Sequence, residues 1–392
     1  MSRYLAYTSP ARGHLYPIVG TLLELMDRGH EVHVRTLASE VPTLRALGLH
    51  AEPIAAEIES ITLDDWKGSG PEEGLGLAYA TFTARAEHEV PDVTRAIEDV
   101  EPSGLLIDVT TVGAAAVAEA GTIPWVQTIP LFQHFSFTPG VPRHLAMVPF
   151  EIAPPGLDVL NGPRKAVGLE PLTAVDSLWR APLHLYYTAP PFGPAGIELP
   201  PTFRMVGPGN WEPPSEPPAF LAEVEHPLVL VSASSELQSD AVLIETALAA
   251  LGADDLEVAV STAAHDPAQF AAPPNAHVER WLPHGPIVGR AACVVCHGGM
   301  GITQKALAAG APVCIVPFGR DQFEVAEFVV EAGAGTCVLP HELDPDSLHA
   351  AVREAMGLSA GAERVAEGFA RAGGAAAAAE AIEALVPAPA RS

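Results

Sequence analysis

The strongest constraint on the fold of this 392-residue chain is an alternation of short apolar strands with amphipathic helices. Residues 4–8 form an apolar run, residues 9–15 predict a glycine-containing loop, and residues 17–28 carry apolar side chains at helical spacing. Gly29 follows as a helix-ending residue, and residues 31–37 predict the next strand. A strand–helix–strand unit of this kind predicts parallel strands covered by helices.

The alternation continues through the first half of the chain and restarts in the second half. Between the two, residues 132–185 are irregular, and residues 207–218 are so rich in proline that they fit neither a helix nor a sheet. We therefore expect an α/β protein with two Rossmann-like domains, 1–206 and 219–392, joined by the 207–218 linker and facing each other across a cleft. The last helix is expected to pack back on the N-terminal domain. The other predicted helices are 82–100, 112–120, 240–251, 361–372 and 375–385, and the other predicted strands are 104–107, 124–128, 228–232, 257–261, 291–296 and 313–316.

The composition limits the partners of the chain. It has 21 Lys and Arg residues against 48 Asp and Glu residues, so it lacks the basic surface that nucleic acid requires. No apolar stretch approaches the length of a membrane span, and no signal peptide is recognisable at the N-terminus, so we expect a cytoplasmic protein without membrane insertion. The four cysteines lie in apolar runs, which suits buried thiols in a reducing compartment.

The second half contains the parts of a site for a nucleotide diphosphate. The apolar run 291–296 breaks into the sequence His-Gly-Gly-Met-Gly at 297–301, and a helical pattern follows over 302–310. Backbone amides and the helix dipole at such a helix start favour an anion. Trp281 precedes this segment as an aromatic residue that can stack on a base, and Asp321 with the adjacent glutamine follows the next apolar run.

At these residues the chain resembles the GT-B glycosyltransferases, in the bacterial natural-product branch related to macrolide and enediyne glycosyltransferases and to plant UDP-glycosyltransferases. Residues 9–17 (SPARGHLYP) are similar to the N-terminal G-H-x-x-P loop of that family, and residues 28–32 to its next turn. Asp108, together with residues 121–124, is similar to its middle strand and helix. The resemblance covers nearly the whole chain. It implies transfer of a sugar from a nucleotide diphosphate sugar to a hydroxyl of a hydrophobic natural-product aglycone.

The resemblance also implies a role for each residue of the donor site. The tryptophan would stack on the nucleobase, the histidine and the glycine-rich amides would hold the diphosphate, and the two serines would lie near the phosphates. The expected nucleotide and phosphate ligands are Ser234, Ser235, Trp281, Leu282, His297, Gly298, Gly299, Met300, Gly301 and Lys305, and the expected donor-sugar ligands are Asp321 and Gln322.

Transfer of a sugar to a hydroxyl requires an activated nucleophile. A histidine is the side chain with a pKa suited to removing that proton at neutral pH, and a carboxylate on its other ring nitrogen fixes the tautomer. By resemblance, His14 would be this general base and Asp108 its partner, and a single displacement would invert the anomeric carbon. The alternative role for His14 is to cap the helix that follows it.

Two positions depart from the pattern of the family. Ile302 stands where a small hydroxyl residue is usual, so one phosphate hydrogen bond is expected to be missing. Lys305 stands where a glutamate often contacts the ribose hydroxyls, and it could bind the diphosphate or be a solvated helix residue. Because a deoxyribose has one hydroxyl fewer, loss of that glutamate favours a TDP-sugar over a UDP-sugar.

Aromatic and apolar side chains in the irregular N-terminal segments are the candidates for binding the acceptor. Aromatics in loops suggest a flat, apolar aglycone, although each of them could simply pack beneath a long loop. The expected acceptor-binding residues are Trp66, Phe82, Phe132, His134, Phe137 and Met147.

The same residues leave two other kinds of protein to consider. A nucleotide-sugar epimerase would need no separate apolar acceptor pocket, and a non-catalytic nucleotide-binding partner protein would not need His14 and Asp108. The sequence Cys293-Val-Val-Cys296-His matches a haem attachment pattern, but its apolar strand would place the two thiols on opposite faces. We expect no cofactor and no metal, small-molecule donor and acceptor as partners, and leave a homodimer open.

Overall fold

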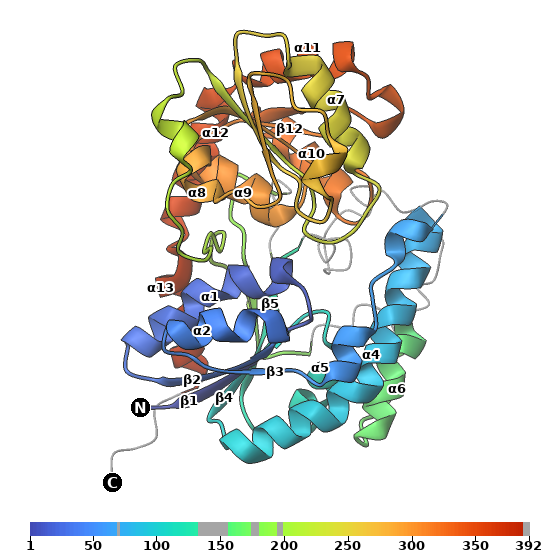
Figure 1. Ribbon diagram of the computed structural model, residues 1–392. Helices are drawn as coiled ribbons and strands as arrows, with labels where there is room; N and C mark the ends of the chain where they lie inside the picture. The colour runs from blue at the N-terminus through green and yellow to red at the C-terminus, as the bar shows by residue number, and fades with distance from the viewer. Residues whose placement is uncertain (69–70, 132–155, 174–179, 194–198, 387–392) are drawn as a thin grey trace. The chain divides into compact units, whose positions relative to one another are not determined.

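The computed structural model describes residues 1–68, 71–131, 156–173, 180–193 and 199–386 of the chain (Figure 1). These residues form two compact units. The first unit comprises Met1–Tyr187, Ile197–Trp211 and Gly373–Ser392, and the second comprises Thr188–Gly196 and Glu212–Ala372. Four acceptor candidates, Phe132, His134, Phe137 and Met147, lie outside the described residues.

The first unit is built on a parallel sheet with the strand order β3-β2-β1-β4-β5-β6-β7. The order runs outward in both directions from β1, as expected when right-handed crossover helices connect parallel strands. The strands are β1 (Arg3–Tyr7), β2 (Glu31–Thr36), β3 (His50–Pro53), β4 (Gly104–Asp108), β5 (Trp125–Ile129), β6 (Leu183–Tyr186) and β7 (Phe203–Met205).

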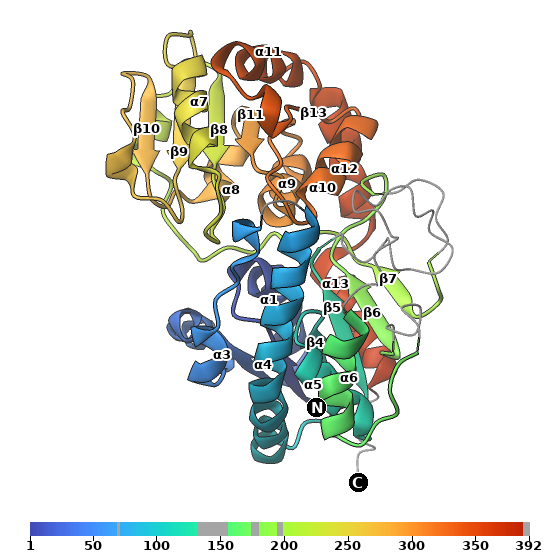
Figure 2. The ribbon, with the colours of Figure 1, turned by 90° about the vertical axis from the view of Figure 1, so that its right-hand side faces the viewer.

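Helices cover both faces of this sheet (Figures 1 and 2). Alternate residues of β1 point to opposite faces, so that Tyr4 and Ala6 join one apolar core and Leu5 and Tyr7 join another. The first core includes residues of α1 and α13, and the second includes residues of α4 and α5. The helices are α1 (Arg12–Asp27), α2 (Val41–Ala46), α3 (Ala56–Ser60), α4 (Pro71–Val100), α5 (Val112–Ala120), α6 (Gly156–Ala166) and α13 (Gly374–Leu385), with short 3-10 turns η1 (Ala38–Glu40) and η2 (Asp65–Lys67).

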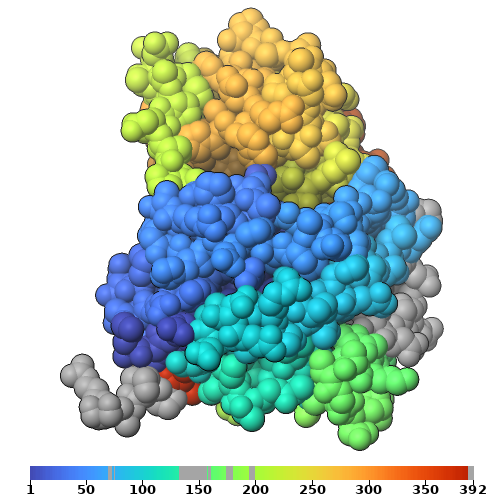
Figure 3. Space-filling view, turned by 60° about the horizontal axis from the view of Figure 1, so that its bottom comes forward, coloured from blue at the N-terminus to red at the C-terminus, as the bar shows by residue number. Residues whose placement is uncertain are grey.

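The C-terminal helix α13 belongs to the first unit, although it follows the second unit in the chain. Ala378, Ala379 and Ile382 of α13 are buried in the core that α1 shares. At its surface, Glu383 accepts hydrogen bonds from Arg28 Nη1 at 2.7 Å and pairs with His30 Nε2 at 2.8 Å. On the face drawn in Figure 3, the visible surface of this unit is formed largely by residues of the N-terminal half, coloured blue to green.

The second unit contains another parallel sheet, with the order β10-β9-β8-β11-β12-β13. Helices α7 and α11 share an apolar core with one face of its strands, and α9 packs against α8 and α12. The strands are β8 (Leu228–Ser232), β9 (Glu257–Ser261), β10 (Ala276–Glu279), β11 (Ala291–Cys296), β12 (Val313–Ile315) and β13 (Gly335–Cys337). The helices are α7 (Ala241–Leu251), α8 (His284–Val288), α9 (Met300–Ala308), α10 (Gln322–Glu331), α11 (Pro345–Ala355) and α12 (Ser359–Arg371), with 3-10 turns η6 (Ala219–Ala222), η7 (Pro267–Gln269) and η8 (Pro340–Glu342).

The prediction of an α/β protein with two parallel sheets is confirmed, but several local predictions are wrong. Helix α4 begins at Pro71 rather than at residue 82, and α6 and most of β6 lie in the segment 132–185 that was predicted to be irregular. Helix α1 begins at Arg12, so the predicted loop 9–15 ends at residue 11. Proline favours the first helical position, yet Pro17 lies inside α1, where its ring removes one helical hydrogen bond. Burial of apolar residues from Leu15 to Leu25 offsets that loss. None of the described helices is long and apolar enough to cross a bilayer.

Candidate active site

His14 and Asp108 meet at the carboxyl end of the first sheet. His14 lies in the first turn of α1, directly after β1, and Asp108 is the last residue of β4. Because β1 and β4 are neighbouring parallel strands, the segments that follow them lie side by side. The Nδ1 atom of His14 lies 2.8 Å from Oδ2 of Asp108.

The Asp108 side chain is fully buried and hydrogen-bonded at both oxygens. Its Oδ1 accepts bonds from the Thr110 amide at 2.9 Å and from the Thr110 hydroxyl at 2.5 Å. A carboxylate can only accept hydrogen bonds, so His14 must carry its proton on Nδ1, which leaves the lone pair on Nε2. The His14 side chain keeps 19% of its surface exposed, so this nitrogen belongs to a residue that solvent or substrate can reach.

The alternative of a capping histidine receives no support from α1. The N-cap residue of this helix is Ala11, which makes no side-chain capping bond. The imidazole is instead bonded to Asp108, across 94 residues of sequence. The arrangement is therefore a histidine–carboxylate pair of the kind that serves general-base chemistry.

Glu89 is a buried carboxyl close to this pair that the sequence analysis did not identify. It lies on α4, and its Oε2 accepts a hydrogen bond from the Gly113 amide at the start of α5, at 2.8 Å. A Cβ on Gly113 would collide with the backbone of Ala86 and with the Glu89 side chain, so only glycine allows this approach. Burial raises the pKa of Glu89 to about 8, against the lowering effect of the α5 amides, and the nearby charge of Asp108 raises it further.

The raised pKa of Glu89 predicts a pH-dependent stability. Since the folded state holds this proton up to about pH 8 while the unfolded chain releases it near pH 4.5, stability must fall as the pH rises between those values. The variant Glu89→Gln keeps an oxygen for the Gly113 amide but cannot titrate. We expect its free energy of unfolding to decrease less than that of the wild type between about pH 5 and pH 8, by on the order of 3 kcal/mol. Urea unfolding of both proteins at several pH values measures it. The exposed Glu87→Gln is the control, and an equal pH slope in wild type and Glu89→Gln would contradict the assignment.

In the second unit, a tight glycine turn connects β11 to α9. Gly298 has φ of +89°, a conformation that favours glycine, and a Cβ there would meet Ile315 and the backbone of Gln322. A Cβ on Gly299, the N-cap residue of α9, would collide with the His297 imidazole. By contrast, a Cβ on Gly301, in the first turn of α9, would meet nothing within 4 Å. The turn thus packs closely on one side and leaves the amide end of α9 open at Gly301.

His297 lies beneath this turn as a neutral imidazole. It is 7% exposed, and its Nδ1 has no hydrogen-bond partner among the described residues. Burial lowers its pKa, and this effect outweighs the nearby Asp240 charge, which raises it. Met300, the next predicted ligand, is buried at the start of α9 and can offer its backbone amide.

Ile302 and Lys305, the two residues that differ from the family pattern, are both largely buried in α9. Ile302 is 9% exposed and packs into the protein, and the neighbouring Thr303 places its hydroxyl 3.6 Å from the buried Cys296 Sγ. Lys305 donates from Nζ to Oε2 of Glu212 at 2.6 Å, and its side chain is 14% exposed, so it is not a solvated helix residue. Glu212 also accepts a hydrogen bond from the Gly285 amide at 2.7 Å. Glu212 lies in the segment 207–218 that was predicted as a linker, and its contact with Lys305 was not predicted.

The segment 281–284 differs along its length in exposure. Trp281 is 51% exposed, whereas Leu282 and His284 are half-buried. Burial lowers the pKa of His284 to about 4, and the positive charge of Lys305 adds to the effect, so this imidazole is neutral at physiological pH. Trp281 is thus one of the large hydrophobic side chains that the described residues expose.

The remaining donor-site candidates fall into one buried network and two less buried residues. Gln322 is 2% exposed, its Oε1 accepts the amides of Phe318 and Gly319 at 2.7 and 3.1 Å, and its Nε2 donates to Gln238 at 2.9 Å. Gln238 and the Ser234 amide both donate to Asp240, at 3.2 and 2.7 Å. The structure therefore joins the loops that follow β8 and β12. Ser235 is exposed, and Asp321, half-buried, is the N-cap residue of α10 without a side-chain capping bond.

Of the acceptor candidates, the structure describes Trp66 and Phe82. Trp66 lies on η2 and Phe82 on α4, both are half-buried, and η2 packs against α4. Lys67 Nζ lies 5.4 Å from the centre of the Trp66 ring. The two aromatic residues therefore come from neighbouring elements, as one apolar surface requires.

Comparisons with known proteins identify relatives of this chain and solved structures with its fold. Residues 245–385 match the family model described as Erythromycin biosynthesis protein CIII-like, C-terminal domain. Over 90% of its length the chain is 28% identical to 4'-demethylrebeccamycin synthase of Lentzea aerocolonigenes, of which it covers 91%. Among solved structures, the glycosyltransferase of kitacinnamycin superposes with a TM-score of 0.80 at 24% identity, over 98% of this chain and 99% of that one. Spinosyn rhamnosyltransferase complexed with thymidine diphosphate has a TM-score of 0.77 at 19% identity, over 98% and 100% of the two chains.

These similarities distinguish between the alternative functions that the sequence left open. A second relative over most of the chain is L-demethylnoviosyl transferase of Streptomyces niveus, 28% identical over 87% of this chain and 86% of that protein. Because the structures with the same fold are glycosyltransferases as well, a glycosyltransferase is favoured over the epimerase and the non-catalytic partner protein. The chain is accordingly a glycosyltransferase with the GT-B fold.

Proposed function

We propose that this enzyme transfers a sugar from a TDP-sugar to a hydroxyl of a hydrophobic natural-product aglycone, with inversion at the anomeric carbon. The observation that carries the proposal is the hydrogen bond between His14 and the buried Asp108. In this mechanism, Nε2 of His14 removes the proton of the acceptor hydroxyl, and the oxygen attacks the anomeric carbon. The bond from that carbon to the diphosphate breaks as the new bond forms, and the imidazolium is stabilised by Asp108.

On the donor side, the start of α9 would stabilise the leaving diphosphate. The amides near Gly299 and Gly301 offer partial positive charge, and the neutral His297 beneath them can donate a hydrogen bond. Trp281 would stack on the base, with Leu282 beside it, while Ser234 and Ser235 would contribute near the phosphates. Asp321 would bind sugar hydroxyls. For Gln322, the bonds to Phe318, Gly319 and Gln238 favour a role in shaping the same loop.

Two observations support TDP over UDP. The spinosyn enzyme, which has the same fold, was solved with thymidine diphosphate. Family members often have a glutamate that contacts the ribose at the helix position where this chain has Lys305. Lys305 instead forms a salt bridge with Glu212. A deoxyribose nucleotide such as TDP has one hydroxyl fewer, so it loses fewer hydrogen bonds than UDP when the glutamate is replaced by lysine.

The test is a turnover assay with TDP-sugars and UDP-sugars against a panel of hydrophobic aglycones. Mass spectrometry detects the glycoside, and the proton NMR coupling of its anomeric proton gives the configuration. We expect an inverted product from a TDP-sugar. A product with the donor's configuration, or turnover restricted to UDP-sugars, would contradict the mechanism or the donor assignment respectively.

A negative charge at the start of α9 should separate donor binding from folding. Gly301→Asp adds a carboxylate where a side chain meets no atom, and a carboxylate in a first helical turn stabilises the helix. The same charge repels a diphosphate, so we expect an unchanged melting temperature and a TDP affinity weaker by about tenfold or more, measured by calorimetry. Ser359→Asp, an exposed residue at the start of α12, is the matched control. Unchanged TDP binding in Gly301→Asp would remove the diphosphate from this helix end.

A further inference from the structure

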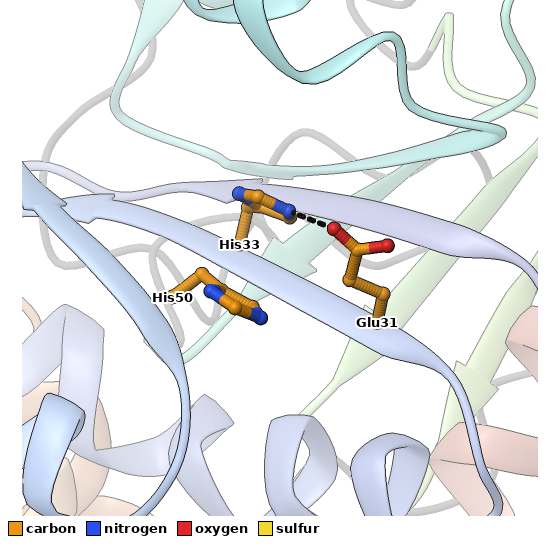
Figure 4. Close-up of side chains that lie close together, drawn as sticks. All are labelled: Glu31, His33 and His50. Carbon is orange, nitrogen blue, oxygen red and sulfur yellow. Dashed lines mark hydrogen bonds and ion pairs between the residues drawn. The ribbon is translucent and has the colours of Figure 1, made fainter.

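Three side chains on the edge of the first sheet form a cluster that the transfer chemistry does not use. They are Glu31 and His33 on β2 and His50 on β3, shown in Figure 4. Each offers one atom capable of binding a metal, and these three atoms lie within 4.8 Å of one another. We propose that Glu31, His33 and His50 form a binding site for a divalent transition-metal ion such as Zn²⁺, separate from the catalytic residues.

The backbone itself brings the three residues together. Glu31 and His33 are two residues apart on one strand, so their side chains point to the same face of the sheet. In the parallel pairing of β2 with β3, His33 is the direct partner of His50. The two imidazole rings stack with their centres 4.7 Å apart and their planes at 19°. Strand register therefore places these side chains together, with His50 exposed and Glu31 and His33 half-buried.

The donor set has the chemistry of a zinc site. Two imidazole nitrogens and one carboxylate oxygen are ligands that Zn²⁺ prefers, and three protein ligands leave a fourth position for water. At present His33 Nε2 lies 2.8 Å from Glu31 Oε1, a contact bridged by one proton. A metal ion would replace that proton, and His50, the most exposed of the three, would complete the set.

The surrounding charges leave the carboxylate available. The Glu31 carboxylate contacts a different neighbour with each of its two oxygens, His33 at Oε1 and Arg3 at Oε2. The Nε atom of Arg3 lies 3.0 Å from Oε2 of Glu31, so Oε1 of Glu31 is the oxygen that can bind the ion. The other nearby cation, Arg35, is paired with Glu52 at 2.7 Å and with Asp99 at 3.7 Å. These partners reduce the repulsion that a bound divalent cation would meet.

The position of the cluster indicates what a bound ion would do. β3 is the edge strand of the sheet and pairs only with β2 among the described strands. An ion held by ligands from both strands would cross-link them and stabilise the edge, because a ligand that binds only the folded state raises its stability. The site would therefore be structural, and sugar transfer would not depend on it.

Calorimetric titration of the chelator-treated, intact enzyme with ZnCl₂ tests the proposal. We expect one Zn²⁺ per chain with micromolar affinity, a melting temperature raised by the ion, and absorption bands of nitrogen-coordinated Co²⁺ when Co²⁺ is the probe. His50→Asn changes an exposed side chain and should weaken binding by about tenfold or more and abolish the shift in melting temperature.

The control is His341→Asn, which alters another surface histidine next to a glutamate, with its Nε2 3.9 Å from Glu342 Oε1. This variant should bind Zn²⁺ as the wild type does. Glu31→Gln provides a second test at the carboxylate ligand. Equal Zn²⁺ affinity in wild type and His50→Asn, or no binding to the wild type at 100 micromolar ion (about ten times the expected dissociation constant), would overturn the proposal.

Discussion

Replacing His14 with alanine is expected to reduce kcat by about 10²- to 10⁴-fold while leaving the affinity for TDP within about twofold of the wild type. The imidazole is the base in the proposed mechanism. Asp108, which contacts Nδ1 of this imidazole, is fully buried and has both oxygens occupied. Binding of the nucleotide is assigned to the second unit, so the loss should fall on turnover.

The measurement is steady-state kinetics with a donor and acceptor that the wild type uses, together with calorimetry for TDP. His88→Ala, a half-buried histidine of α4, is the control for loss of an imidazole from the same unit and should retain activity. Near-normal kcat in His14→Ala would exclude this residue as the base. A parallel loss of TDP affinity would point to damage beyond the acceptor side.

Asp108→Asn should lower kcat almost as severely, although it changes only one atom. The new side chain can keep its oxygen on the Thr110 amide and hydroxyl, which places its NH₂ group against His14 Nδ1. Two donors cannot face each other, so the imidazole must carry its proton on Nε2, where the base needs a lone pair. We expect a decrease of about 10²- to 10⁴-fold in kcat with little change in KM or in TDP affinity.

The matched control for this variant is Asp92→Asn. Asp92 is another buried carboxyl of the first unit, which accepts hydrogen bonds from the Tyr7 hydroxyl at 2.9 Å and from the Ala55 amide at 3.3 Å. Its loss should lower stability and leave kcat largely intact. If Asp108→Asn and Asp92→Asn have the same small effect on kcat, Asp108 has a structural role only.

The sequence predicted those features that depend on local patterns. Strand β11 has the bounds expected from its apolar run, and the glycine turn into α9 follows because few other residues allow its backbone. The parallel sheets covered by helices also follow from the alternation of elements. Short strands such as β7 and β13, with three residues each, were not predicted, because so few residues show no periodicity.

Side-chain pairings across the fold could not be predicted in the same way. Glu89 is one of 48 acidic residues, and nothing in its neighbours along α4 distinguishes a buried carboxyl from a solvated one. The bond of Lys305 to Glu212 joins residues 93 positions apart, and Glu212 stands in a proline-rich segment that predicts only a linker. Helix α6 was also missed, since Gly162 and Pro163 in its interior are poor helix formers.

The most direct test of metal-independent TDP-sugar binding is a calorimetric titration of the purified enzyme with TDP and with UDP in buffer containing EDTA. We expect TDP to bind in the micromolar range, more tightly than UDP, because the start of α9 and His297 provide the charge stabilisation that a metal would otherwise supply. Absence of binding to either nucleotide at millimolar concentration would contradict the donor site assigned to residues 281–322.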